Sequence, residues 1–62
     1  MQQTTINKIK VGEFFKLSQN GRVYVRGEYD RSFREYSYCD YDDVNREHFA
    51  KSTKKVLVDF EF

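Results

Sequence analysis

RVYVRGEYD, at residues 22–30, decides the fold, because mainly apolar and mainly polar side chains alternate along it. Val23 and Val25 share one parity, while Tyr24 and Arg26 share the other. A period of two residues is typical of a strand with one buried face. The segment is therefore predicted to be the central strand of a sheet, with the valines facing the core and Tyr24 and Arg26 facing solvent.

Similar patterns predict the structure of the other segments. Residues 11–17 are predicted to form a first strand with a kink near Gly12, residues 34–39 a third strand rich in tyrosine, and residues 55–62 a last strand. Residues 40–50 begin with carboxylates and then place apolar side chains at helical spacing. A short helix capped by an aspartate or a compact loop is expected there.

The lengths of the loops set which residues pair across the sheet. A two-residue loop at Asn20-Gly21 would place Lys16 opposite Val25, whereas a three-residue loop ending at Gly21 pairs Phe15 with Val25. The three-residue loop is therefore predicted, with Gly21 in the left-handed conformation that favours glycine.

The next loop decides where the tyrosines of the third strand lie. If it has four residues, Tyr36 and Tyr38 face the core. If it has three, the same rings join Tyr24 and Arg26 on one exposed platform. The four-residue loop is preferred, because the shorter one would bury Glu35 without a partner.

The whole pattern predicts an all-β fold, a small antiparallel meander. Pairing the last strand beside the first would cover two exposed edges, so the meander is predicted to close into an SH3-like barrel. Residues 1–8 are polar and lack periodicity. They are predicted to be a flexible lead-in to a single small β domain at residues 9–62.

Size and composition exclude several classes of protein. A chain of 62 residues buries only about 60% of its unfolded surface. One cysteine and one histidine exclude an internal disulfide and a closed zinc site, so the six phenylalanines and five tyrosines must supply the core. A lone thiol, with no signal peptide and no apolar run of about 20 residues, predicts a cytoplasmic protein without a membrane segment. Self-association through a strand edge stays open, so a homodimer is possible.

No catalytic, metal or cofactor motif is predicted. The carboxylates from Asp40 to Glu47 resemble a calcium loop, but no glycine is sixth and no glutamate twelfth from Asp40 or Asp43. Cys39 and His48 are the only conceivable nucleophile and base, and no oxyanion motif accompanies them. The chain is therefore predicted not to be an enzyme and to have no small-molecule substrate.

Arginine and tyrosine residues are interleaved along the central strands, and this pattern is the one feature of the sequence that indicates a function. The candidate binding surface consists of Tyr24, Arg26, Arg31, Arg34 and Lys16. Tyrosine and arginine are favoured at binding hot spots, which predicts an interaction module for a protein partner or for a second copy of the chain. The alternative is a single-stranded nucleic-acid binder that stacks bases on the same residues. A net charge of only +1 counts against that alternative.

Four stretches together resemble small uncharacterised proteins of bacteria and their mobile elements. They are VGEFFKL (11–17), VYVRGEYDRS (23–32), YSYCDYDDVN (36–45) and VLVDFEF (56–62). The similarity covers residues 9–62. It implies no activity and assigns no functional residue.

Overall fold

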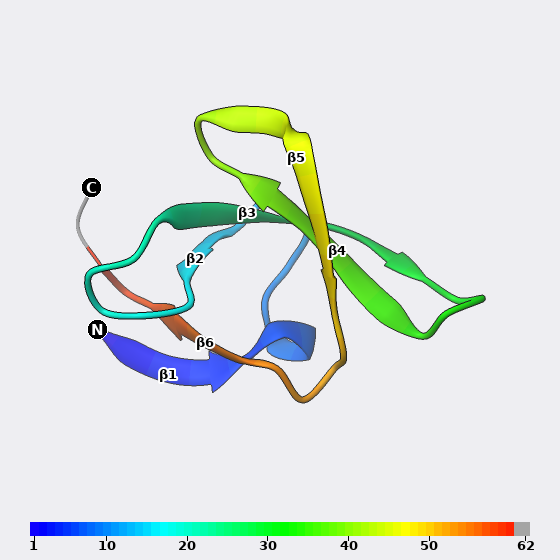
Figure 1. The fold of residues 1–62 in the computed structure, drawn as a ribbon. Helices are drawn as coiled ribbons and strands as arrows, with labels where there is room; N and C mark the ends of the chain where they lie inside the picture. The colour runs from blue at the N-terminus through cyan, green and yellow to red at the C-terminus, as the bar shows by residue number, and fades with distance from the viewer. Residues whose placement is uncertain (61–62) are drawn as a thin grey trace.

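The computed structural model describes residues 1–60, apart from the side chain of Val44. The chain folds into strands and one short 3₁₀ helix: β1 (Gln2–Thr5), η1 (Ile6–Lys8), β2 (Phe14–Lys16), β3 (Val23–Asp30), β4 (Glu35–Asp40), β5 (Asp43–Ala50) and β6 (Lys55–Val58). The strands form one antiparallel sheet in the order β1-β6-β2-β3-β4-β5 (Figure 1). The predicted all-β fold class is confirmed.

The order of the strands agrees with the prediction in the middle of the sheet and differs at its ends. β3 lies between β2 and β4, and the last strand, β6, lies beside β2 through the pair Lys16 and Leu57. β1 and β5 stand at the two ends of the order and do not pair with each other. The sheet is therefore open, and the predicted closure into a barrel is not found.

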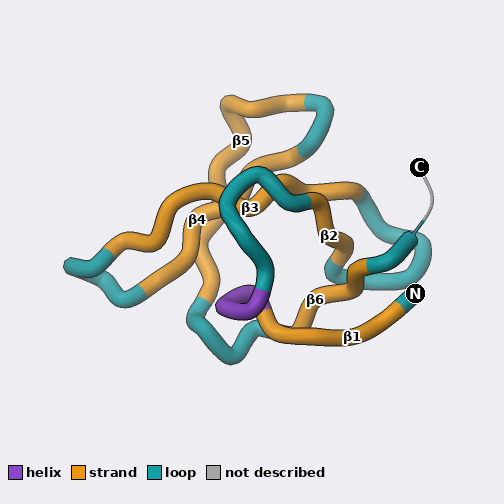
Figure 2. The backbone as a smooth tube through the Cα atoms, turned by 180° about the vertical axis from the view of Figure 1, so that it is seen from behind, coloured by secondary structure: helices purple, strands orange, loops and turns teal. Residues whose placement is uncertain are grey.

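The open sheet curls around its core. Buried apolar side chains from η1 and the residue after it, and from β2, β4, β5 and β6, form one cluster: Ile6, Ile9, Phe15, Tyr38, Ala50 and Val56. Such a cluster requires the half of the sheet with β1 and β6 to bend back toward the half with β4 and β5, which Figure 2 shows from behind. η1 supplies Ile6, which is fully buried, to the inside of this curve.

The pairing of β2 with β3 differs by one residue from the prediction. Phe15 pairs with Tyr24 instead of Val25, because the turn closes with a hydrogen bond from the Gly21 N–H to the carbonyl of Ser18. Gly21 does not adopt a positive φ, so that prediction is wrong as well. Directly paired residues share a face of the sheet. Tyr24 therefore faces the core beside Phe15, and the predicted orientation of β3 is reversed.

The pairing of β3 with β4 follows the rejected three-residue register from Tyr24 to Arg26 and neither predicted register beyond it. Arg26 pairs with Tyr38 and Tyr29 with Tyr36, and the register shifts between these pairs. This shift is a β-bulge, which changes the face that later residues occupy. Gly27 lies in the bulge, where a Cβ atom would collide with the hydroxyl of Ser37. Tyr38 is buried as predicted, but it reaches the core through a different pairing.

Residues 43–50 form the strand β5, so the predicted helix or loop at residues 40–50 is wrong. Tyr38 pairs with His48 and Ser37 pairs with Phe49. Neighbouring side chains of β5 therefore point to opposite faces, His48 inward and Phe49 outward. Pairing with β4 outweighs the local helical spacing, because an added strand gains a ladder of hydrogen bonds.

The ends of the chain also differ from the predictions. Gln2–Thr5 form β1 and pair with β6, in place of the flexible lead-in at residues 1–8. The predicted last strand at residues 55–62 is present at Lys55–Val58. Its final two residues lie outside the described part of the chain.

Candidate functional site

The predicted binding surface is divided by the fold. Arg26, predicted to be exposed, is only 8% exposed, and its Cζ lies 4.6 Å from the centre of the Tyr36 ring. Its Nε is buried and has no hydrogen-bond partner among the described residues. Tyr24 is half-buried against Phe15 and Tyr38. Because Tyr24 and Arg26 face inward, they cannot contribute to the predicted binding surface.

The other three predicted residues lie apart from one another. Arg31 and Arg34 are exposed in the turn between β3 and β4, and Arg34 has a φ of 54°. Lys16 is half-buried on β2, with its Nζ 5.0 Å from the centre of the Phe60 ring. The five residues therefore do not form one surface.

The inner face holds an aromatic cluster in place of a binding surface. The ring centres of Phe15, Tyr24 and Tyr38 lie 5.3 to 5.7 Å from one another, and His48 stacks on Tyr38 at 5.1 Å. Burial raises the pKa of the Tyr38 phenol, and the nearby Tyr24 and Asp40 raise it further. The cluster is thus a structural one, with its phenol kept neutral.

A polar network borders this cluster where β4 ends. The buried carboxylate of Asp40 accepts hydrogen bonds from Nε2 of His48 at 2.9 Å and from Nη1 of Arg22 at 3.1 Å. The hydrogen bond from His48, with that from Arg22, holds the pKa of Asp40 below its usual range. The network satisfies a buried charge and fastens β5 to β4 and to Arg22, the residue before β3.

The structure assembles no catalytic pair from the thiol and the imidazole and no metal-binding group within residues 1–60. Cys39 pairs with Glu47 on the outer face, whereas His48 lies on the inner face, so the sheet separates the only thiol from the only imidazole. No group of three or more histidine, cysteine or acidic side chains suited to a metal ion occurs within residues 1–60. Over the same range no helix is long and apolar enough to span a bilayer.

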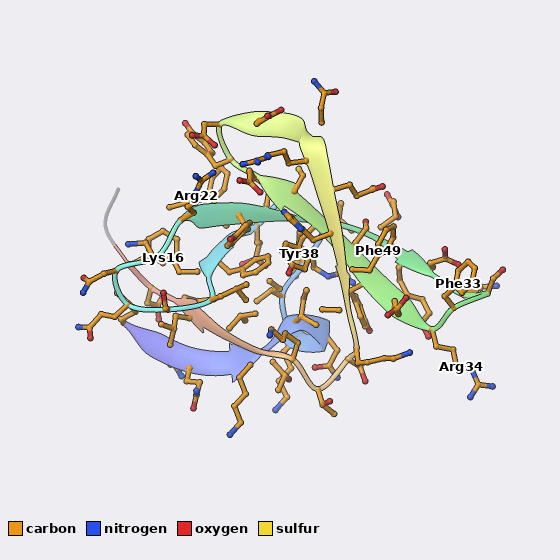
Figure 3. The ribbon with its side chains drawn as sticks, in the orientation of Figure 1. Lys16, Arg22, Phe33, Arg34, Tyr38 and Phe49 are labelled. Carbon is orange, nitrogen blue, oxygen red and sulfur yellow. The ribbon has the colours of Figure 1, made fainter. Side chains whose placement is uncertain are left out.

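The outer face carries exposed aromatic side chains beside the edge of the sheet. Phe49, on β5, is 51% exposed, and Phe33, at the tip of the β3–β4 hairpin, is 69% exposed. Both line a hollow of about 240 Å³ together with Asp30 and Glu35. Figure 3 shows Phe33 at this tip and Arg34 extending away from Phe49.

A second hollow also has Phe49 in its lining. It measures about 430 Å³, and Glu28, Arg31, Ser37 and Glu47 are among the residues that line it. Phe49, on an edge strand, thus lines both of these hollows and a third of about 340 Å³ that Ala50, Lys51 and Lys54 border. The sequence does not single out Phe49 or Phe33 as binding residues, because their proximity depends on the pairing of β4 with β5.

Comparison of the chain with family models, with curated proteins and with solved structures found no match.

Proposed function

We propose that this chain is a small interaction module that binds an extended segment of a partner protein along the outer edge of β5. The position of Phe49 carries the proposal. It lies on the last strand of the sheet order, is half-exposed and lines three hollows. A large exposed aromatic side chain beside unpaired backbone groups is the arrangement that strand addition uses.

The regular part of β5 is the part best suited to accept a strand. From Glu47 to Ala50 the pairing with β4 is continuous, while the register shifts nearer Asp43. Main-chain hydrogen bonds to residues 47–50 supply affinity, and side chains of the added segment enter the hollows beside Phe49. The charged first half of β5 resists edge-to-edge aggregation, since charges on edge strands oppose unwanted pairing.

The opposite edge of the sheet offers less to a partner. β1 consists of Gln2–Thr5 and presents only amide and hydroxyl side chains beyond its backbone. None of the hollows described above adjoins it. Without an apolar anchor, main-chain hydrogen bonds alone give little net free energy, because they replace bonds to water.

The other predicted functions have less support. Single-stranded nucleic acid needs exposed rings beside cations, and Tyr24, Arg26 and Tyr38 lie on the inner face. A second copy of the chain is the main competing occupant of the β5 edge. Small curled β domains, SH3-like domains among them, are often interaction modules, which is an analogy of fold alone. No catalytic function is proposed.

Selection from a displayed library of random peptides tests the proposal directly. Enriched peptides are expected to bind the purified chain in fluorescence anisotropy, and Phe49→Ser is expected to weaken binding at least about tenfold, or about 1.4 kcal/mol. Phe14→Ser is the matched control, since Phe14 is 41% exposed on the same face but lies on β2. Failure to enrich any peptide, or equal loss in both variants, would refute the proposal.

A further inference from the structure

The regular end of β5 carries opposite charges on either side of an aromatic ring. Glu47, Phe49 and Lys51 are spaced two residues apart, so they share the outer face of the strand. Lys51 directly follows β5, and its Nζ lies 3.8 Å from Oε2 of Glu35 on β4, which keeps it beside the sheet. The outer side chains along this edge therefore read acid, aromatic, base, and in the reverse direction base, aromatic, acid.

Both charges are accessible to a second strand. Glu47 is exposed and makes no ion pair with any residue that the structure describes. The side chain of Lys51 is 70% exposed, and its contact with Glu35 is long. An exposed, loose ion pair of this kind contributes little to stability, so Lys51 loses little by turning toward another carboxylate.

A second copy of β5 complements this edge in one antiparallel register. Residues directly opposite each other in an antiparallel pair share a face of the sheet. With a twofold axis at Phe49, the two Phe49 rings lie opposite each other, and Glu47 of each copy lies opposite Lys51 of the other. Aromatic pairs and pairs of opposite charge are both favourable across strands. On the inner face His48 lies opposite Ala50, so a ring meets a small side chain.

The neighbouring registers lack this match. An axis at Glu47 sets the two carboxylates of that residue against each other, which is unfavourable. An axis at His48 places Phe49 opposite Glu47, and an axis at Ala50 places Phe49 opposite Lys51. Among these four registers, the axis at Phe49 is the one that pairs ring with ring and acid with base. The sequence of the edge thus specifies how two copies align.

We infer that two copies of the chain pair through β5 about a twofold axis at Phe49, and that this pairing competes with the partner segment. The pairing needs no other protein, whereas the competition rests on the proposed function. Identical patches that meet about a twofold axis are the commonest form of self-association. About five residues of each copy take part, against roughly 20–30 a side in stable interfaces. The dimer is therefore weak, and its dissociation on dilution frees the edge for a partner.

Analytical ultracentrifugation over a range of chain concentrations tests the pairing. Glu47→Lys and Lys51→Glu each turn an attractive contact into a repulsive one, and the twofold axis repeats that contact. Each variant is therefore expected to raise the dissociation constant of the dimer at least about tenfold. Lys8→Glu makes the same change of charge as Lys51→Glu on the exposed part of η1, away from β5, and is expected to leave the dimer unchanged.

A charge swap tests the register itself. The double variant Glu47→Lys/Lys51→Glu restores opposite charges at both contacts and is expected to regain most of the dimer. An equimolar mixture of the two single variants is expected to form a heterodimer for the same reason. Circular dichroism and thermal melting of every variant check that the fold is kept. Failure of both the swap and the mixture to recover the dimer would overturn the inferred register.

A saturating amount of a peptide enriched by the library selection tests the competition. It is expected to convert the dimer into monomers that each bind one peptide, and a dimer that persists with the peptide bound would overturn the competition. A chain that stays monomeric at its highest soluble concentration while the peptide binds would overturn the inference and leave the proposed function intact. A dimer that follows the charge swaps while no peptide binds would support the pairing and refute the proposed function.

Discussion

Nε2 of His48 donates a hydrogen bond of 2.9 Å to Oδ1 of Asp40, which joins the edge strand β5 to its neighbour β4. The other carboxylate oxygen, Oδ2, accepts from Nη1 of Arg22 at 3.1 Å. Three segments of the chain therefore meet at one buried carboxylate. The strand proposed to bind a partner is held in place from its inner face, while its outer face carries Phe49.

Asp40 is expected to make stability depend on pH in acid. Because its pKa is lower in the folded chain than in the unfolded one, the carboxylate stabilises the fold above its ordinary pKa of about 3.9. That contribution is lost as the pH falls below this value and through the folded pKa. Urea unfolding at several pH values should show a smaller acid loss for Asp40→Asn than for the wild type. Parallel curves would contradict this role.

The inward orientation of Phe15 is tested by comparison with its neighbour. Phe15 is fully buried, so Phe15→Ala is expected to lower the free energy of unfolding by about 3–5 kcal/mol. Phe14→Ala, on the exposed face, is expected to cost less than about 1.5 kcal/mol. Urea denaturation measures both. A larger loss for Phe14 would mean that β2 presents the opposite face to the core.

Arg26 carries a buried charge, and its Nε has no hydrogen-bond partner among residues 1–60. An unsatisfied buried donor costs about 1–3 kcal/mol, and desolvation of the charge adds to that cost, whereas a buried cation–π contact such as that with Tyr36 contributes about 2 kcal/mol. Arg26→Met is therefore expected to raise the free energy of unfolding by about 1 kcal/mol. Arg22→Met, which removes a bond to Asp40, should lower it. Destabilisation by Arg26→Met would show that the guanidinium is satisfied in solution.

Arg34 has a left-handed backbone, with a φ of 54° in the turn between β3 and β4. This conformation costs a residue with a Cβ atom about 1–2 kcal/mol, and glycine avoids that cost while losing about 0.5–1 kcal/mol of chain entropy. Arg34→Gly is expected to raise the free energy of unfolding by about 0.5–1 kcal/mol. Arg31→Gly, in the same turn without a positive φ, should lower it. Thermal melts that shift in the same direction for both variants would contradict the assignment.

Local patterns predict the strands better than they predict the faces. Residues 22–30 were predicted as the central strand, and β3 begins at Val23. The orientation was wrong because both parities of this strand carry apolar area: Val23 and Val25 on one, Tyr24 with the stacked stem of Arg26 on the other. Rings bury more surface than valines, so Tyr24 joins Phe15 inside. The two-residue period alone does not show which face of the strand buries more apolar surface.

The candidate site was less predictable than the fold. Phe49 belongs to a segment whose aspartates and apolar spacing resemble a capped helix, and its true partner, Ser37, is distant in sequence. The β-bulge at Gly27 adds a further change of face that no local signal fixes. A site formed by a hairpin tip and an edge strand depends on both of these non-local features. The candidate site is therefore formed by Phe33 and Phe49 with Asp30 and Glu35, and not by the residues of the surface predicted from the sequence.

Amide hydrogen exchange measured by NMR, with and without a saturating peptide enriched by the library selection, tests the central claim most directly. If the peptide adds a strand to the sheet, exchange should slow at outward-facing amides of residues 47–50 and stay unchanged in β1. Slowing confined to β1, or binding that leaves the amides of β5 unprotected, would contradict strand addition at this edge.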